Sequence, residues 1–302
     1  MELPPTGHDP VLLDEVLDAV AVRPGATVVD CTLGRAGHAR AIAERLGPDG
    51  LLVGLDADPR NLEFAQQRLA DAPCGVRLFH ANFAELPDVL RAVDRPAVDG
   101  VLADLGISTN QLVDERYGLS FAADMPLDMR IDPRTPRSAA DLVNSLREQD
   151  LANVLYELAQ ERYSRRIARK IAVARRVAPI NTTERLAELV RSAIPRARGR
   201  ADKIDPATRT FMALRMAVND ELGNLRALLE AAPRLLNVGG RVAVISFHST
   251  EDRIVKQAFR SAEQTGQLKL VTKKPLSPAD DELARNPRSR SAKLRVAEKL
   301  KS

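Results

Sequence analysis

The amino-acid sequence predicts an α/β fold, with helices on both faces of a parallel sheet and a helical module inserted into it. Up to residue 106, apolar runs alternate four times with helical patterns, and these runs are continuous, as in strands buried on both faces. Residues 112–205 are instead polar, rich in turns and mostly helical in pattern. Helix and strand alternate again after residue 206, so the helical stretch is an insertion after the fourth strand.

Apolar runs and turn residues divide the first half of the chain into elements. Residues 10–22 carry apolar side chains at helical spacing, and Arg23-Pro24-Gly25 ends this first helix. Gly47-Pro48-Asp49-Gly50 is a strong turn signal before the second strand. The expected strands are 26–30, 51–56, 76–80 and 98–106, and the helices between them end at Leu46 or span 59–70 and 84–93. We expect right-handed crossovers between the parallel strands.

The rest of the chain is predicted to be helical before it returns to a strand. The clearest helical pattern is 139–178, whose apolar stripes are Leu142, Leu146, Leu151, Val154, Leu155 and Leu158, followed by Ile167, Ile171 and Ala174. A basic loop lies between Pro195 and Pro206. Residues 208–236 predict one long amphipathic helix, and 241–247 predict a buried strand after a glycine turn. One or two short strands are expected around 266–273.

Length and composition limit the class of protein. A chain of 302 residues suggests two domains, or one domain with a large insertion. No apolar run is long enough to span a bilayer and no signal peptide is visible, so we expect a cytoplasmic protein with Cys31 and Cys74 reduced. The histidines are far apart in sequence and form no zinc-binding pattern, so no metal is expected.

Two basic stretches suggest a polyanionic partner. The net charge is only +4, but residues 161–203 hold 13 Lys and Arg against 4 Asp and Glu, and residues 285–302 hold 7 against 1. Such stretches favour nucleic acid, although some of the charges belong equally well to solvated helix faces. An aromatic content of 3% without tryptophan leaves few side chains on which bases could stack.

The strongest chemical signal lies between the first two strands. Asp30 ends the first strand, Gly34 and Gly37 lie in the loop that opens the next helix, and Asp56 ends the second strand. Ligands of open α/β sheets bind at the carboxyl ends of the strands, where glycines let the backbone approach closely. A carboxylate at the end of the second strand can accept hydrogen bonds from the ribose hydroxyls of an adenosine. The sheet is therefore predicted to be Rossmann-like and to bind a nucleoside cofactor.

The glycine loop favours one nucleoside cofactor over another. The dinucleotide fingerprint G-x-G-x-x-G is absent, and NAD(P) needs a site for its pyrophosphate at a helix N-terminus. S-adenosylmethionine has no phosphate, so the looser loop fits it better. After the third strand, Phe83 could cover an adenine face or belong to the core. Asp104 ends the fourth strand, where it would overlook the methionine end of the cofactor and the substrate.

Several ordered blocks of sequence resemble one family. The chain resembles the RsmH (MraW) family of bacterial small-subunit ribosomal RNA methyltransferases, which modify the exocyclic N4 of a cytidine in the decoding region. The matching runs are HDPVLLDEVL (8–17), DCTLGRAGH (30–38), GLDADP (54–59), DLGISTNQL (104–112), PLDMRID (126–132), PATRTFMALRMAVNDEL (206–222), GGRVAVISFHSTEDRIVK (239–256) and NPRSRSAKLRVAEK (286–299). These runs are spread along almost the whole chain, from residue 8 to residue 299.

The resemblance implies a fold, a cofactor and a set of contacts. The fold is a Rossmann-like S-adenosylmethionine-dependent methyltransferase sheet, formed by 1–111 and 206–302, with an inserted helical substrate-recognition domain at 112–205. The implied cofactor contacts are Ala36, Gly37, His38, Asp56, Phe83, Asp104 and Gln111. Cys31 and Ala36 stand where the family usually has glycine, and Leu33 where an aromatic is common. Alanine at position 36 allows a backbone contact if its φ is negative.

The methyl transfer itself requires alignment and an acceptor for a proton. Cytosine's exocyclic amine is a poor nucleophile, because its lone pair is delocalised into the ring, and it needs acceptors that favour a pyramidal nitrogen. We predict Asp104 as the catalytic candidate, with the carbonyls of Leu105 and Gly106 and the Ser108 side chain beside it. His248 is a second candidate, with a structural, hydrogen-bonded histidine as the alternative.

Three other functions remain compatible with parts of the sequence. An NAD-dependent dehydrogenase would use the same sheet, although the missing fingerprint argues against it. An RNA-binding ribosome assembly factor on a methyltransferase fold fits the basic stretches equally well. A small-molecule methyltransferase leaves the charge of 285–302 unexplained. The expected partner is ribosomal RNA, within the small ribosomal subunit, and the helical insertion could support a homodimer.

Overall fold

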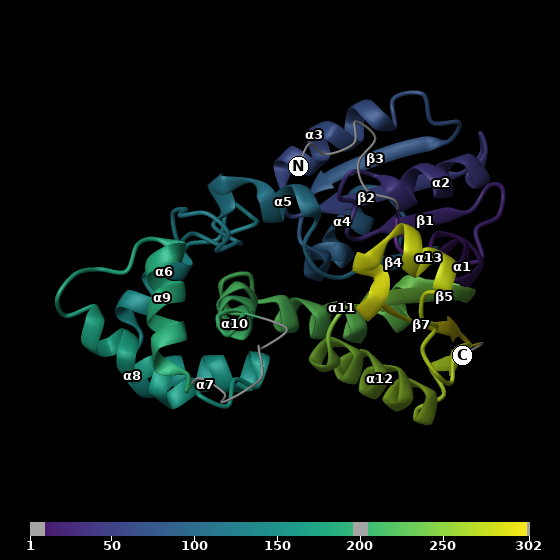
Figure 1. Cartoon of the computed structure of the whole chain (residues 1–302). Helices are drawn as coiled ribbons and strands as arrows, with labels where there is room; N and C mark the ends of the chain where they lie inside the picture. Colours follow the sequence, from purple (N-terminus) through teal and green to yellow (C-terminus); the bar gives the residue numbers. More distant parts are fainter. Residues whose placement is uncertain (1–9, 196–204, 301–302) are drawn as a thin grey trace. The chain divides into compact units, whose positions relative to one another are not determined.

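A computed structural model describes residues 10–195 and 205–300, and the chain divides into two compact units (Figure 1). The first unit comprises the residues up to Gly106 and those from Leu222 onward, and the second comprises Ile107–Glu221. The boundaries expected from sequence, 112 and 205, both lie inside the second unit. The basic loop expected after Pro195 falls almost entirely outside the described residues. In the described ranges, no helix is long and apolar enough to cross a membrane.

The first unit is built on a seven-stranded sheet in the order β3-β2-β1-β4-β5-β7-β6. Its strands are β1 (Thr27–Asp30), β2 (Leu51–Asp56), β3 (Gly75–His80), β4 (Val98–Asp104), β5 (Leu236–Ser246), β6 (Leu268–Leu270) and β7 (Lys293–Lys299). The first five strands run parallel, as predicted, whereas β7 runs antiparallel to both of its neighbours. The sheet is therefore mixed, because the parallel arrangement predicted from the first four strands does not extend to this edge.

Charged residues conceal β7 in the sequence. Its run, KLRVAEK, places Arg295 between Leu294 and Val296, and charged residues stand at both ends of the run. The structure buries Arg295 because its Nε donates to Asp252 Oδ1 at 2.7 Å, which pairs the buried charge. The strand is therefore buried like a core strand, although its sequence has no continuous apolar run.

Helices cover both faces of the sheet, as predicted. On one face, α1 (Leu13–Ala19), α2 (Gly37–Leu46) and α3 (Pro59–Arg68) pack against side chains such as Val28 and Leu52. On the other face, α4 (Leu86–Ala92), α11 (Glu221–Leu235) and α12 (Ser249–Gln264) pack against side chains such as Val29 and Val53. Successive residues of a strand point to opposite faces, so the continuous apolar runs supply both cores. The short elements η1 (Phe83–Glu85), α13 (Asp280–Arg285) and η3 (Pro287–Ser291) complete this unit.

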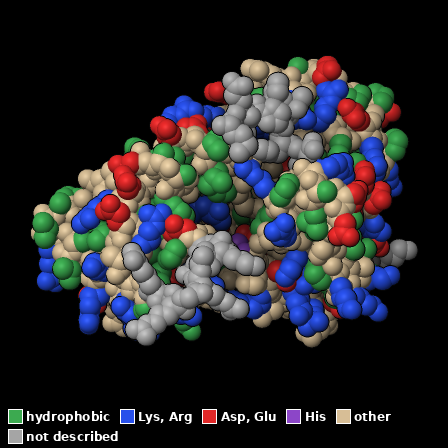
Figure 2. Space-filling model, in the orientation of Figure 1, with side chains coloured by type: hydrophobic (Ala, Val, Ile, Leu, Met, Phe, Trp, Pro, Cys, Tyr) green, Lys and Arg blue, Asp and Glu red, His purple; other side chains and the backbone are tan. Residues whose placement is uncertain are grey.

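The second unit is helical, and no named strand occurs among its described residues. It contains α5 (Thr109–Val113), η2 (Glu115–Tyr117), α6 (Ala139–Ser145), α7 (Glu148–Ala159), α8 (Ser164–Ala174), α9 (Thr183–Ala193) and α10 (Thr208–Val218). The α7 helix packs against both α8 and α10. Ile167 and Ile171 of α8 are buried, whereas Arg165, Arg166 and Arg169 are exposed. In Figure 2, Lys and Arg side chains border the lower left of the molecule, where Figure 1 places α8.

The long helix predicted over 208–236 is instead two helices. The break falls between Val218 and Glu221, where Asp220 has a left-handed φ of 45° that an α-helix cannot continue through. Residue 219 is an asparagine, and its side chain bonds to a loop rather than pointing to solvent. Because α10 packs against α6 and α7, it belongs to the helical unit and α11 belongs largely to the sheet unit.

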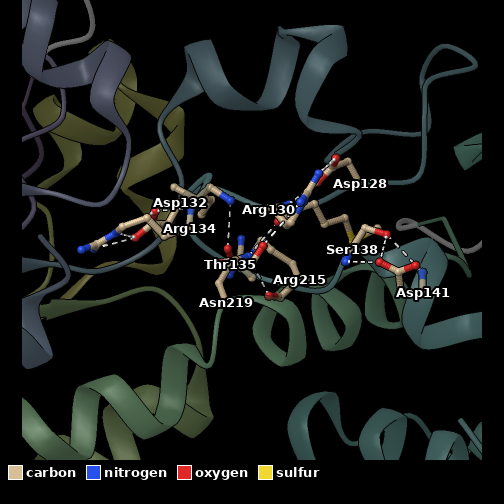
Figure 3. Close-up of polar contacts among 11 residues, drawn as sticks. Asp128, Arg130, Asp132, Arg134, Thr135, Ser138, Asp141, Arg215 and Asn219 are labelled. Carbon is tan, nitrogen blue, oxygen red and sulfur yellow. Dashed lines mark hydrogen bonds and ion pairs between the residues drawn. The ribbon is translucent and has the colours of Figure 1, made fainter. Parts of the chain in front are cut away.

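The PLDMRID run forms a loop that is held against the end of α10 (Figure 3). The Asn219 side chain accepts the Ile131 N–H at 2.9 Å and donates to the Met129 carbonyl at 2.8 Å. Met129 is fully buried and has a left-handed φ of 65°. Arg130 pairs with Asp128 along the same loop. This family block is therefore an architectural part of the helical unit.

Candidate active site

Three predicted carboxyl groups meet at one edge of the sheet. Asp30, Asp56 and Asp104 are the last residues of β1, β2 and β4, and β1 lies between the other two strands. The chain order reverses at β1, which makes this edge the topological switch point at which open α/β sheets bind their ligands. The strand-end positions predicted from sequence are confirmed, because each apolar run ends at its aspartate.

The loop between β1 and α2 is fastened to the end of β2. The Gly34 N–H donates to Asp56 Oδ2 at 2.7 Å, and the Leu33 N–H donates to the Leu55 carbonyl at 2.9 Å. Gly34 has a φ of 51°, which glycine adopts without steric cost. A Cβ atom on Gly54 would approach Leu33 Cδ1 to 2.9 Å, so the missing side chain at Gly54 makes room for Leu33.

Ala36 also has a left-handed backbone conformation. Its φ is 57°, so the negative φ that was the condition for a backbone contact with the ligand is not met. Its N–H donates to the Leu33 carbonyl at 2.8 Å, and its own carbonyl accepts the Arg40 N–H at 3.1 Å. Both backbone polar groups are therefore used inside the protein. The turn has the conformation that glycine favours, and the alanine bears the steric cost of adopting it.

The Asp56 carboxylate has acceptor capacity left for a ligand. Its Oδ2 accepts the Gly34 N–H and the Asn61 side-chain amide, the latter at 3.2 Å, and its Oδ1 accepts the Asp58 N–H at 2.8 Å. A carboxylate oxygen can accept two hydrogen bonds, so Oδ1 retains one position among the described residues. Burial raises the pKa of Asp56 to about 6. The remaining acceptor position fits the hydrogen bond that a ribose hydroxyl would donate.

One carboxyl oxygen of Asp104 accepts no hydrogen bond from the described residues. Its backbone N–H donates to Thr32 Oγ1 at 2.6 Å, and its side-chain Oδ1 is buried without a partner among the residues that the structure describes. Burial, together with repulsion from Asp30 and Glu251, raises the pKa of Asp104 well above its usual range. Burial likewise raises the pKa of Asp30 to about 7. Acidic groups in this state favour a cationic ligand, because a positive charge stabilises their ionised forms.

His38 and Phe83 lie in the same unit, and Gln111 lies in the other. His38 is buried in the first turn of α2, with Nε2 2.8 Å from the Val11 carbonyl and Nδ1 3.8 Å from Asp104 Oδ2. Phe83 begins η1 and is half-buried against the core. Gln111 is buried in α5, where its Oε1 accepts the Ser108 N–H at 3.1 Å. Gln111 and Ser108 therefore belong to the helical unit, and the carboxyl edge belongs to the sheet unit.

His248 caps a helix. Its Nδ1 accepts the Glu251 N–H at 3.4 Å, and Glu251 Oε2 accepts the N–H groups of Phe247 and His248 at 2.9 and 3.2 Å. These bonds fix the start of α12 through Nδ1. Nε2 of the ring is buried without a hydrogen-bond partner among the described residues, so a catalytic role of His248 stays a prediction. Glu251 and Thr32 were not predicted as neighbours of Asp104. The capping-box spacing of His248 and Glu251 was the one signal that could have found Glu251.

The sheet order and the buried acidic edge define a methyltransferase of the Rossmann-like class, with S-adenosylmethionine as its methyl donor. The residues at the edge suit that donor, since Asp56 can accept from a ribose and the Asp30 and Asp104 carboxyls favour a cation. The chain belongs to the MraW methylase family, whose family model matches residues 5–300. Membership of a methylase family decides against the NAD-dependent dehydrogenase.

Curated relatives match over nearly the whole chain. A protein of Acidobacterium capsulatum is 48% identical over 299 residues, covering 97% of this chain and 98% of the relative. A protein of Geobacter sulfurreducens is 48% identical over 308 residues, covering 97% and 99%. Both are named ribosomal RNA small subunit methyltransferase H. A solved rRNA methylase from Streptococcus thermophilus overlaps with a TM-score of only 0.43 at 11% identity, covering 96% of this chain and 94% of that chain.

Proposed function

We propose that this protein transfers a methyl group from S-adenosylmethionine to the exocyclic N4 of a cytidine in the decoding region of 16S, small-subunit ribosomal RNA. The names of the two relatives support the RNA substrate. The observation that carries the proposal is Asp104, a strand-end carboxyl whose buried Oδ1 lacks a partner among the described residues. An acceptor of this kind suits an amine that must lose a proton when it is methylated.

The methyl donor is proposed to lie at the carboxyl ends of β1 and β2. Asp56 Oδ1 would accept from the ribose, and Phe83 would cover one face of the adenine. The N–H groups of Gly37 and His38 begin α2, where backbone donors have no acceptor within the helix, and they would face the amino-acid end of the donor. The full proposed set of donor-binding residues is Ala36, Gly37, His38, Asp56, Phe83, Asp104 and Gln111.

The bound donor supplies an electrophilic methyl group. The protein must then hold the target nitrogen in line with that group, which removes much of the entropic barrier. Hydrogen bonds from the amine to Asp104 Oδ1, and to the carbonyls of Leu105 and Gly106, would favour a pyramidal nitrogen with an available lone pair. The cytosine must also leave its stack to reach these groups.

Nucleoside analysis of ribosomal RNA tests the function. RNA from cells that lack this protein should be missing one methyl group on one cytidine of the small subunit, and the wild-type protein should restore it. The Asp104→Asn variant should restore it at a rate lower by roughly 100-fold or more, because the amide cannot take up the proton. The Asp94→Asn variant, at an exposed carboxylate of the same unit, is the matched control and should behave as wild type.

Two outcomes would contradict the proposal. Wild-type rates for Asp104→Asn with normal donor binding would show that Asp104 is misplaced in this mechanism. RNA binding without methyl incorporation would instead favour an RNA-binding assembly factor on a methyltransferase fold.

We further propose that the substrate is the RNA within the small ribosomal subunit, and that the protein works in the cytoplasm and forms a homodimer. Support for self-association comes from exposed apolar side chains of the helical unit, among them Tyr156, Val173 and Val177. Sedimentation of the pure protein over a concentration series measures this directly. A single monomeric species at every concentration would exclude the dimer.

A further inference from the structure

The His38 ring lies between the backbone carbonyl of Val11 and the carboxyl of Asp104. Its Nε2 is 2.8 Å from the Val11 oxygen, and its Nδ1 is 3.8 Å from Asp104 Oδ2. A carbonyl oxygen can only accept a hydrogen bond, so Nε2 must carry a proton. Burial lowers the pKa of His38 to about 4, which keeps the ring neutral near pH 7. A neutral ring has one N–H, so Nδ1 presents a lone pair to Asp104.

The lone pair of His38 Nδ1 needs a proton on the facing carboxyl. If Asp104 were ionised, its Oδ2 and the lone pair of Nδ1 would both be acceptors and would repel each other. A proton on Oδ2 can instead be donated to Nδ1, which makes the contact attractive. The surroundings favour the protonated form, since burial and then the charges of Asp30 on β1 and Glu251 on α12 raise the pKa of Asp104. The 3.8 Å separation exceeds hydrogen-bond length, but active-site contacts of this kind tighten when substrate binds.

We propose that His38 is the positioning residue of Asp104: tied to Val11 through Nε2, it holds Asp104 Oδ2 through Nδ1 and leaves Oδ1 to accept a hydrogen bond from the substrate amine. The two oxygens of the carboxyl therefore have different tasks. When Oδ1 takes up the proton of the amine, the proton on Oδ2 passes to the lone pair of His38 Nδ1, so the carboxyl stays neutral. The identity of the substrate amine rests on the proposed function, whereas the His38–Asp104 contact does not.

The segment around Val11 holds the His38 ring in place on its Nε2 side. A Cβ atom on Gly37 would lie 3.3 Å from Pro10 Cβ, so this segment packs closely on the start of α2. The Leu12 N–H donates to Glu282 Oε1 of α13 at 2.8 Å, which ties the segment to the C-terminal part of the unit. The Val11 carbonyl is thus held in place, and His38 cannot rotate freely about it.

Two substitutions of His38 remove its Nδ1 contact and its Nε2 contact separately. His38→Gln places an amide where Nε2 lies and can still donate to Val11, but it has no atom in place of Nδ1. His38→Asn places an amide near the Nδ1 position, which can bond to Asp104, but it cannot reach Val11. We expect kcat to fall by at least about 10-fold in His38→Gln. The donor Kd should stay within about 3-fold of wild type, because the proposed donor contact of His38 is its backbone N–H, which the substitution keeps. His38→Asn should keep a higher kcat and have the lower melting temperature.

The reverse order of kcat would overturn the proposal. If His38 only anchored the N-terminal segment, His38→Gln would be the more active variant as well as the more stable one. Equal losses of kcat in both variants would also contradict it, because they would show that the Nδ1 position has no separate task.

A nitrogen NMR measurement tests the same contact without methyl transfer, so it stands even if the proposed substrate is wrong. With ¹⁵N-labelled histidine, His38 should show a protonated Nε2 and an unprotonated Nδ1 near pH 7. The Nδ1 shift should move in Asp104→Ala. His80, whose Nε2 is likewise 3.0 Å from a backbone carbonyl, is the internal control and should not move. A protonated Nδ1, or an unchanged His38 shift, would refute the contact.

Discussion

Three carboxyl groups share the buried edge of the sheet, and their burial decides how charge is distributed there. Asp30 is 1% exposed, and its pKa is raised to about 7, chiefly by burial. In the unfolded chain the same group titrates near its ordinary value of 3.8. Between these two values the folded state holds a proton that the unfolded state has lost, so rising pH lowers the free energy of unfolding.

This linkage predicts that Asp30→Asn is more stable than wild type at pH 8. The gain should vanish towards pH 4. Its upper limit is about 4 kcal/mol, because the pKa of Asp30 is 3.8 in the unfolded chain and about 7 in the folded one. Below that window, stability is governed by carboxylates such as Asp141, whose pKa is lowered by the hydrogen bond from the Ser138 N–H. Denaturant unfolding from pH 4 to 8 measures the difference, with Asp94→Asn as the exposed control. Parallel stability curves for Asp30→Asn and wild type would disprove the linkage.

For single residues, the sequence could predict which of them end the strands, but not which contacts their side chains make. Asp30, Asp56 and Asp104 were predictable because each closes an apolar run. The left-handed φ of Ala36 was not, since the turn imposes it against the preference of alanine. The contact of His38 with Val11 and Asp104 joins three segments that are far apart in the chain, and no local pattern encodes it.

At the scale of elements, α8 separates a buried apolar stripe from an exposed basic one. Ile167 and Ile171 are fully buried, whereas Arg165 and Arg166 are exposed. Arg169 lies 3.6 Å from Glu148, but an ion pair so exposed contributes little to stability. These arginines can therefore bind a polyanion without cost to the helix.

Reversing this charge should weaken RNA binding. We expect the triple variant Arg165→Glu, Arg166→Glu and Arg169→Glu to bind ribosomal RNA less tightly, with a salt slope smaller by roughly one unit for each phosphate that is no longer neutralised. A matched triple variant of exposed arginines in the sheet unit, at Arg77, Arg91 and Arg95, makes the same change of net charge. If both variants bind equally well across a salt series, α8 does not touch the RNA.

Element boundaries followed from sequence where apolar periodicity was clear and failed where charge or turns interrupted it. The helix expected over 208–236 divides at Asp220, because the backbone there turns left-handed. The β7 strand was hidden because Arg295 finds Asp252 as a buried partner. Both failures arise from tertiary contacts that override local preference.

At the scale of the whole molecule, the chain combines a sheet unit that carries the acidic edge and a helical unit inserted into it. Each has its own buried side chains, so the two can be examined separately by methods that resolve segments of the chain. The division was predictable from the loss of strand patterns after residue 106. Its exact limits were not, because α10 reads as part of a longer helix but packs with α6 and α7.

We propose that the carboxyl edge of the sheet unit binds the methyl donor. Hydrogen exchange with and without S-adenosylmethionine tests this proposal. We predict slower exchange in segments 31–38, 56–58 and 104–106, where the strand ends and the start of α2 lie. Segments 23–27 and 47–51, which precede β1 and β2 at the opposite edge, should be unchanged. If donor binding leaves the first group of segments unprotected, or protects the second group instead, the donor does not bind at this edge.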